Sequence, residues 1–134
     1  MLEAYSSGKT IASGGVVPFD SVKLLKGETA VLSGSGAVQL NRCGVYSVTA
    51  VVDGTPAAAG AATIQINQDG VAVASITDPL AVTTVGVTLT LPTLIQVKQS
   101  NGPCCCKSPS MLQVVNAGVG LNNANTRIVI TKVC

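Results

Sequence analysis

The sequence predicts an all-β protein, a sandwich or barrel built from about eight short strands. Three observations lead to this prediction. Apolar and polar residues alternate through residues 41–73, which places one row of side chains in a core and the other towards solvent. No stretch shows a convincing helical pattern. Glycine, proline, asparagine and aspartate interrupt the apolar segments at short intervals, as turns between strands do.

The alternation is clearest at the start of the block 41–73. Four apolar residues there stand at every second position: Tyr46, Val48, Ala50 and Val52. Ile64 and Ile66 repeat the pattern in a second strand. Asp69-Gly70 follows, and this pair tolerates the positive φ angles of a tight hairpin turn. We therefore expect three strands in order, with a hairpin that joins the last two.

The remaining elements follow from turn residues and short apolar runs. Residues 1–15 are expected to form an N-terminal arm or an edge strand, and residues 16–134 the folded domain. Asp78-Pro79 and Asn101-Gly102-Pro103 are expected to separate strands. Residues 57–62 are rich in alanine, but Pro56 and Gly60 favour a loop or the start of a strand. Further strands are expected at 29–32, 37–40, 71–76, 83–98, 111–116 and 126–133.

Composition argues against nucleic acid as a partner. The chain has 134 residues, a size typical of one domain, and a net charge of only +2. Lys23 with Lys26 is the nearest approach to a basic cluster, and the chain has no tryptophan, one phenylalanine and two tyrosines. Binding to a phosphate backbone needs several converging cations, and single-strand binding adds aromatic rings on which bases stack. The sequence supplies neither.

A membrane is also not expected. Residues 80–97 form an uncharged run of eighteen, which is long enough to raise the question of a membrane span. Val87, Leu89 and Leu91 alternate there with Thr88 and Thr90, as in a half-buried strand rather than a lipid-facing helix. The first residues, 1–5, have neither the basic nor the apolar segment of a signal peptide.

The residue inventory predicts no enzyme and no cofactor. There is no histidine to act as a base or a metal ligand, and a cysteine nucleophile would lack its usual imidazole partner. The acidic residues are scattered, mostly at turns or chain ends. They are Glu3, Asp20, Glu28, Asp53, Asp69 and Asp78.

Four segments in order resemble a known family. They are VPFD (17–20), CGVYSVTAVV (43–52), TIQINQDGVAV (63–73) and RIVITKV (127–133), with a glycine-rich segment after the first. The chain is similar over residues 16–134 to the trimeric jelly roll of the tumour-necrosis-factor and complement type. It is most similar to the bacterial and bacteriophage branch, which includes the C-terminal domain of collagen-like spore-surface glycoproteins and domains of phage fibres and decoration proteins. The resemblance implies an antiparallel jelly-roll β-sandwich that forms a homotrimer.

The resemblance also implies a structural role. The sequence has no Gly-X-Y collagen repeat and begins at Met1 shortly before the domain, so we expect a head domain that sits on a pre-existing lattice. A capsid decoration (cement) protein or a short head-fibre protein of a bacteriophage fits this, assembled in the host cytoplasm and located on the virion surface. The expected partners are further copies of the chain and the major capsid or another virion protein. Trimer contacts are expected through the apolar rows of 83–97 and 127–133.

Two alternatives remain open at this stage. One is a tip or adhesin module that recognises a receptor or glycan, which would bring in a component of the host surface as a partner. An exposed aromatic cluster on a loop would favour it. The other is a structural protein of the spore surface (exosporium), which would need a separate anchoring partner.

The five cysteines are the remaining candidate site: Cys43, Cys104, Cys105, Cys106 and Cys134. If eight main strands run alternately up and down, an even number of strands separates these positions, and all five fall at one end of the molecule. Three interpretations stay open. They are free thiols in a reducing cytoplasm, a disulfide within or between subunits formed after release, or a thiolate metal site. Three consecutive cysteines do not match the spacing that zinc prefers, although a trimer axis would gather one cysteine from each subunit.

Overall fold

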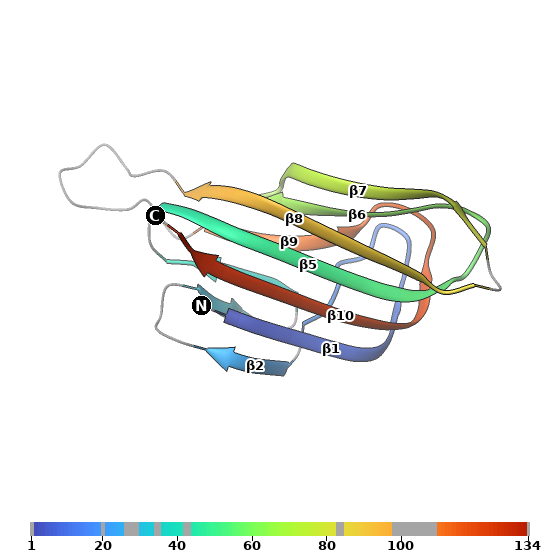
Figure 1. The fold of residues 1–134 in the computed structure, drawn as a ribbon, viewed down its shortest axis with the longest axis horizontal. Coiled ribbons are helices and arrows are strands. Elements are labelled where there is room, and N and C mark those ends of the chain that lie inside the picture. Colours follow the sequence, from blue (N-terminus) through green and yellow to red (C-terminus); the bar gives the residue numbers. More distant parts are fainter. Residues whose placement is uncertain are drawn as a thin grey trace.

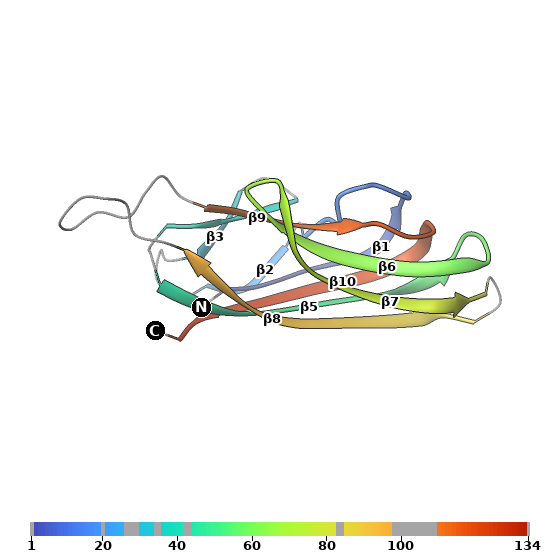
Figure 2. The same cartoon turned by 90° about the horizontal axis from the view of Figure 1, so that it is seen from above.

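The protein is a sandwich of two five-stranded antiparallel sheets, seen in a computed structural model that describes residues 2–19, 21–25, 30–33, 36–41, 44–82, 85–97 and 110–133 (Figure 1). The first sheet has the strand order β2 (Ser21–Leu25), β1 (Leu2–Ile11), β10 (Leu121–Lys132), β5 (Gly44–Pro56) and β8 (Val87–Val97). The second has the order β3 (Ala30–Ser33), β4 (Ala37–Leu40), β9 (Ser110–Asn116), β6 (Gly60–Gln68) and β7 (Val71–Ala81). Figure 2 shows the two layers from the side. The predicted all-β antiparallel jelly-roll sandwich is confirmed.

The core lies between the sheets and follows the predicted alternation. Tyr46 and Val48 on β5, and Ile64 and Ile66 on β6, are fully buried. Their neighbours Ser47, Thr49 and Gln65 are only partly buried, because successive side chains of a strand point to opposite faces. The period-two pattern of the sequence therefore identified correctly which row of β5 and β6 faces inward.

The β6–β7 hairpin turns at Asp69 and Gly70, as predicted. Their φ angles are 52° and 86°, the positive values that favour an Asp-Gly pair in a two-residue turn. The Asp69 carboxylate accepts a hydrogen bond from the Met111 N–H at 2.9 Å, and the Asp69 N–H donates to the Met111 carbonyl at 2.9 Å. The turn thus also fixes the start of β9.

Three segments differ from the sequence expectations. Residues of the expected arm or edge strand form β1, which lies inside the first sheet between β2 and β10, because Leu2, Ala4 and Ile11 are buried in the core. Asp78-Pro79 does not end a strand: β7 continues to Ala81. β7 is the edge strand of its sheet, where proline removes no ladder hydrogen bond. Strand β2 was not expected at all.

The end of the sandwich at which β1 finishes is organised by a buried asparagine. Asn116 is 1% exposed; its amide donates to the Val119 carbonyl at 2.9 Å, and its side-chain oxygen accepts from the Gly118 N–H at 3.1 Å. Its backbone exchanges hydrogen bonds with Gly14 and Gly15. The side-chain amide also donates to the Ile11 and Ala12 carbonyls, each at 3.4 Å, so Asn116 connects the end of β1 with the β9–β10 turn.

The described part of the chain has no helix with the length and apolar character that a membrane span requires.

Candidate functional site

The candidate surface is the side of the first sheet that faces away from the core. We call it the outer face and define it by the outward residues of its three longest neighbouring strands. These are Asn125, Arg127, Val129 and Thr131 on β10; Val45, Ser47, Thr49, Val51 and Asp53 on β5; and Thr88, Thr90, Pro92, Leu94 and Gln96 on β8. Each of them alternates with a buried or half-buried residue that points to the core.

The register of the three strands aligns these residues in rows across the sheet. Thr49 pairs with Val129 on one side and with Pro92 on the other, and Val51 pairs with Arg127 and Thr90. Thr49, Val51 and Val129 are half-buried by their neighbours, whereas Leu94 is 67% exposed. The outer face is therefore a hydroxyl-rich and aliphatic surface, with one large apolar side chain that projects from its β8 margin.

This arrangement corrects the expected use of the apolar rows. Leu89 and Leu91 on β8, and Ile128 and Ile130 on β10, are buried between the two sheets of one chain. They fill the intramolecular core, since the side chains of the second sheet pack against them. The surface left for a partner is the opposite row of the same strands, in which threonine, serine and valine predominate.

Two charged residues interrupt the outer face, Asp53 and Arg127. The Asp53 carboxylate accepts a hydrogen bond from the Asn125 N–H at 3.3 Å. An Arg127 guanidinium nitrogen lies 3.9 Å from a carboxylate oxygen of Glu3, on the adjacent strand β1. The Arg127 side chain is 55% exposed, and the Glu3 side chain 16%. The Arg127 guanidinium thus stays open to approach from outside the sheet, whereas Asp53 is half-buried.

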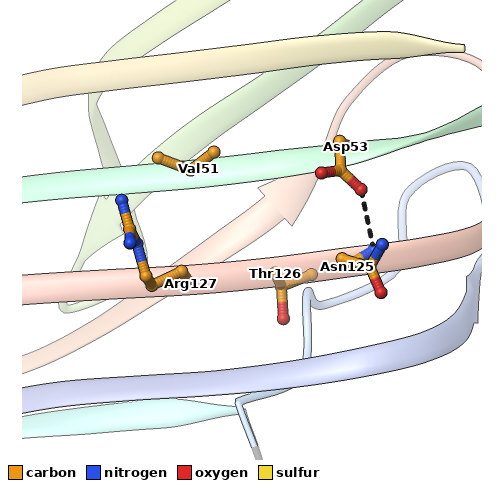
Figure 3. Close-up of a pocket in the computed structure, with 5 residues that line it drawn as sticks. All are labelled: Val51, Asp53, Asn125, Thr126 and Arg127. Atoms are coloured by element: carbon orange, nitrogen blue, oxygen red, sulfur yellow. Dashed lines mark hydrogen bonds between the residues drawn. The ribbon is translucent and has the colours of Figure 1, made fainter.

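A shallow pocket of about 310 Å³ lies between these charges (Figure 3). It is lined by Val51, Asp53, Asn125, Thr126 and Arg127. Thr126 itself is buried, and its hydroxyl donates to the Pro18 carbonyl at 2.7 Å. The pocket therefore has a carboxylate at one end, a guanidinium at the other and a valine side chain beside them.

The aromatic residues do not form a binding cluster. The chain has three, and all lie in the described part. Tyr46 and Phe19 are buried at 0% and 1% exposure, and Tyr5 is 43% exposed on β1, next to Arg127 across the ladder. A sugar ring that stacks on this protein would find a single tyrosine on a strand, not a loop with several rings.

The cysteines Cys43, Cys104, Cys105, Cys106 and Cys134 lie outside the described residues, so the thiol, disulfide and metal interpretations stay predictions. The described residues that lead into those stretches can be placed. Gly44 pairs with Val97, and the Val133 N–H donates to the Val45 carbonyl at 2.8 Å. The strand ends that adjoin residues 42–43, 98–109 and 134 therefore meet at one end of the first sheet. Within the described ranges, no group of three or more histidine, cysteine, aspartate or glutamate side chains is arranged to hold a metal ion.

Sequence reasoning missed Asp53, Arg127 and Leu94 as members of one surface. The outward direction of Asp53 and Arg127 could have been predicted from the alternation, since Asp53 follows Val52 and Arg127 precedes Ile128. The strand order that puts β10, β5 and β8 side by side was not readable from local periodicity, because these strands lie far apart in the chain.

No family model and no curated protein sequence matches the chain. Solved structures do. PRD1 vertex protein P5 is 18% identical over 99% of this chain and 96% of that one, with a TM-score of 0.64. Murine APRIL is 6% identical over 98% of both chains, with a TM-score of 0.62. Eiger TNF from S. frugiperda is 12% identical over 99% of this chain and 92% of that one, with a TM-score of 0.61. These likenesses show the tumour-necrosis-factor-like jelly-roll fold that the sequence predicted.

Proposed function

We propose that the chain is a structural protein of a bacteriophage virion, a homotrimeric capsid decoration or short head-fibre protein. One observation carries the proposal: the likeness to PRD1 vertex protein P5 extends over nearly the whole of both chains. The name of that protein places it at a vertex. The resemblance of segments such as residues 43–52 and 63–73 to phage decoration domains points in the same direction.

The outer face supports self-association as the way the chain assembles. A sheet surface of valine and threonine with few charges loses little hydration when it is covered, so burying it stabilises a complex. Leu94, at 67% exposure, supplies an apolar side chain of the kind that anchors such contacts. A patch that packs against a different patch on an identical copy forms a closed ring when the rotation closes. The resemblance implies that this ring is a trimer.

The alternatives receive less support. A glycan-binding tip would profit from several exposed aromatic rings, and Tyr5 is the single exposed one in the chain. No feature of the described residues favours a spore-surface protein over a virion protein. We also propose that the chain has no catalytic role, because it lacks histidine, and its described carboxylates Asp53 and Glu3 contact the Asn125 N–H and the Arg127 guanidinium.

The location is tested on purified particles. Phage particles from a host that carries this gene are banded on a density gradient, and the band is analysed by mass spectrometry and labelled with gold-conjugated antibodies against the chain. The proposal predicts peptides of this chain in the particle band, and label on the head surface. Label on facets would favour a decoration protein, and label confined to vertices a short fibre. Absence of the chain from the particles, with its presence in spores or cell envelopes, would contradict the proposal.

A further inference from the structure

The two charges of the outer face, Asp53 and Arg127, are opposite in sign, and this indicates which partner covers the face. Resting on the proposed self-association, we propose that Asp53 of one copy forms an ion pair with Arg127 of the next copy. The partner of this surface is then a second copy of the chain. The contact sets which surfaces of identical chains recognise each other, beyond the apolar packing that would hold them together.

Arg127 is poorly paired within its own chain. Its distance of 3.9 Å to Glu3 is too long for a good charge-assisted hydrogen bond, and this ion pair is the one polar contact of its side chain with the described residues. A guanidinium carries five donors in a planar fork that matches a carboxylate. Most of that capacity is therefore available to a partner.

Asp53 offers the matching acceptor. One carboxylate oxygen accepts the Asn125 N–H at 3.3 Å, and the carboxylate makes no other hydrogen bond or ion pair with the described residues. The carboxylate and the guanidinium occupy diagonal positions, since Asp53 pairs with Asn125 and Arg127 pairs with Val51. The shallow pocket between them leaves room for an incoming side chain.

Burial of the outer face makes pairing necessary. A charge that is covered without a partner is strongly destabilising, whereas opposite charges that meet across an interface offset much of that cost. Asp53 and Arg127 are the only charged residues of the outer face as defined above, so the face is neutral and complementary to a second copy of itself. In a ring, the outer faces of neighbouring copies meet around the axis, where Asp53 of one copy lies against Arg127 of the next.

A charge exchange tests the pair in the full chain. Sedimentation velocity over a dilution series compares wild type with Asp53→Arg, Arg127→Asp and the double variant Asp53→Arg/Arg127→Asp. Lys132→Asp serves as the control, because it changes the net charge as Arg127→Asp does but lies off the outer face. Asp53→Asn is also prepared, because it removes the charge but keeps a hydrogen-bond acceptor for the Asn125 N–H. Circular dichroism of every variant verifies the fold.

Each single reversal is expected to raise the concentration at which half of the trimer dissociates at least tenfold, since like charges then face each other. The double variant is expected to return to within a few fold of wild type, and Lys132→Asp to stay near it. An assembled wild type whose single reversals assemble equally well would overturn the pair while leaving the proposed self-association in place. A double variant that assembles no better than the single reversals would also overturn the ion pair. A wild type that is monomeric throughout would overturn both.

Discussion

The buried side chain of Asn116 joins two backbone segments that are distant in sequence. In Asn116→Ala, the Gly118 N–H and the Val119 carbonyl lose their partner at part-buried positions. An unsatisfied buried group costs about 1–3 kcal/mol, and partial burial lowers that cost, so we expect the free energy of unfolding to fall by about 1–3 kcal/mol in urea titrations. Asn122→Ala, at an exposed asparagine of β10, is the matched control and should stay within about 0.5 kcal/mol of wild type. Equal effects of the two changes would contradict this role.

Two buried hydroxyls on paired strands make a second contrast at the residue scale. Ser6 and Thr126 are partners in the β1–β10 ladder, at 2% and 3% exposure. The Thr126 hydroxyl donates to the Pro18 carbonyl at 2.7 Å, whereas the Ser6 hydroxyl has no partner among the described residues. Thermal and urea unfolding should show Thr126→Val less stable by about 1–2 kcal/mol, and Ser6→Ala equal to wild type or more stable. A large loss of stability in Ser6→Ala would mean that its hydroxyl is bonded after all.

At the scale of elements, alternation predicted the interior strands well. The inward-facing residues of β5 and β6 were predicted correctly, because each strand has one buried and one more open face. Apolar and polar residues therefore alternate along it with a period of two. The same reasoning misplaced β1 and the end of β7. Whether Leu2 and Ala4 lie inside a sheet depends on β2 and β10 as neighbours, and whether Pro79 ends a strand depends on its edge position. Both facts are set by strand order, which local sequence does not encode.

The packing of the β9–β10 turn on β6 yields a third prediction. A Cβ atom at Gly118 would overlap the Ala61 carbonyl oxygen and the Thr63 nitrogen, which are backbone atoms that cannot rotate away. At Gly70, φ is 86° and no atom lies near a Cβ, so alanine there meets only conformational strain. We expect Gly118→Ala to lower the free energy of unfolding by more than about 2 kcal/mol, and Gly70→Ala by about 1 kcal/mol. The reverse order in denaturant titrations would contradict the packing of this turn.

At the scale of the whole molecule, the sequence predicted the fold class and the likeness to trimeric jelly rolls, but not the surface that a partner covers. The cysteines attracted attention because of their rarity and clustering, and they lie outside the described residues. The outer face consists of ordinary residues such as Thr49 and Val129, which only the strand order brings together. A candidate site built from common residue types therefore needed the assembled sheet before it became visible.

Leu94 gives the prediction at this scale. Leu94→Asp places a charge on the outer face without touching the core, because the leucine is 67% exposed. We expect the variant to fold with wild-type circular dichroism but to sediment as a monomer at concentrations at which wild type is assembled. Val71→Asp is the matched control, since Val71 is 65% exposed on β7 of the other sheet, and it should leave assembly unchanged. If both variants assemble as wild type does, the outer face is not the contact surface.

The mass of the purified wild-type chain in solution tests the central claim most directly. Light scattering coupled to size exclusion, at micromolar concentration and physiological salt, measures it without a tag or a partner. The proposed assembly predicts three times the mass of one chain, unchanged over a tenfold dilution. A protein with the mass of one chain throughout would contradict the trimer and the role of the outer face.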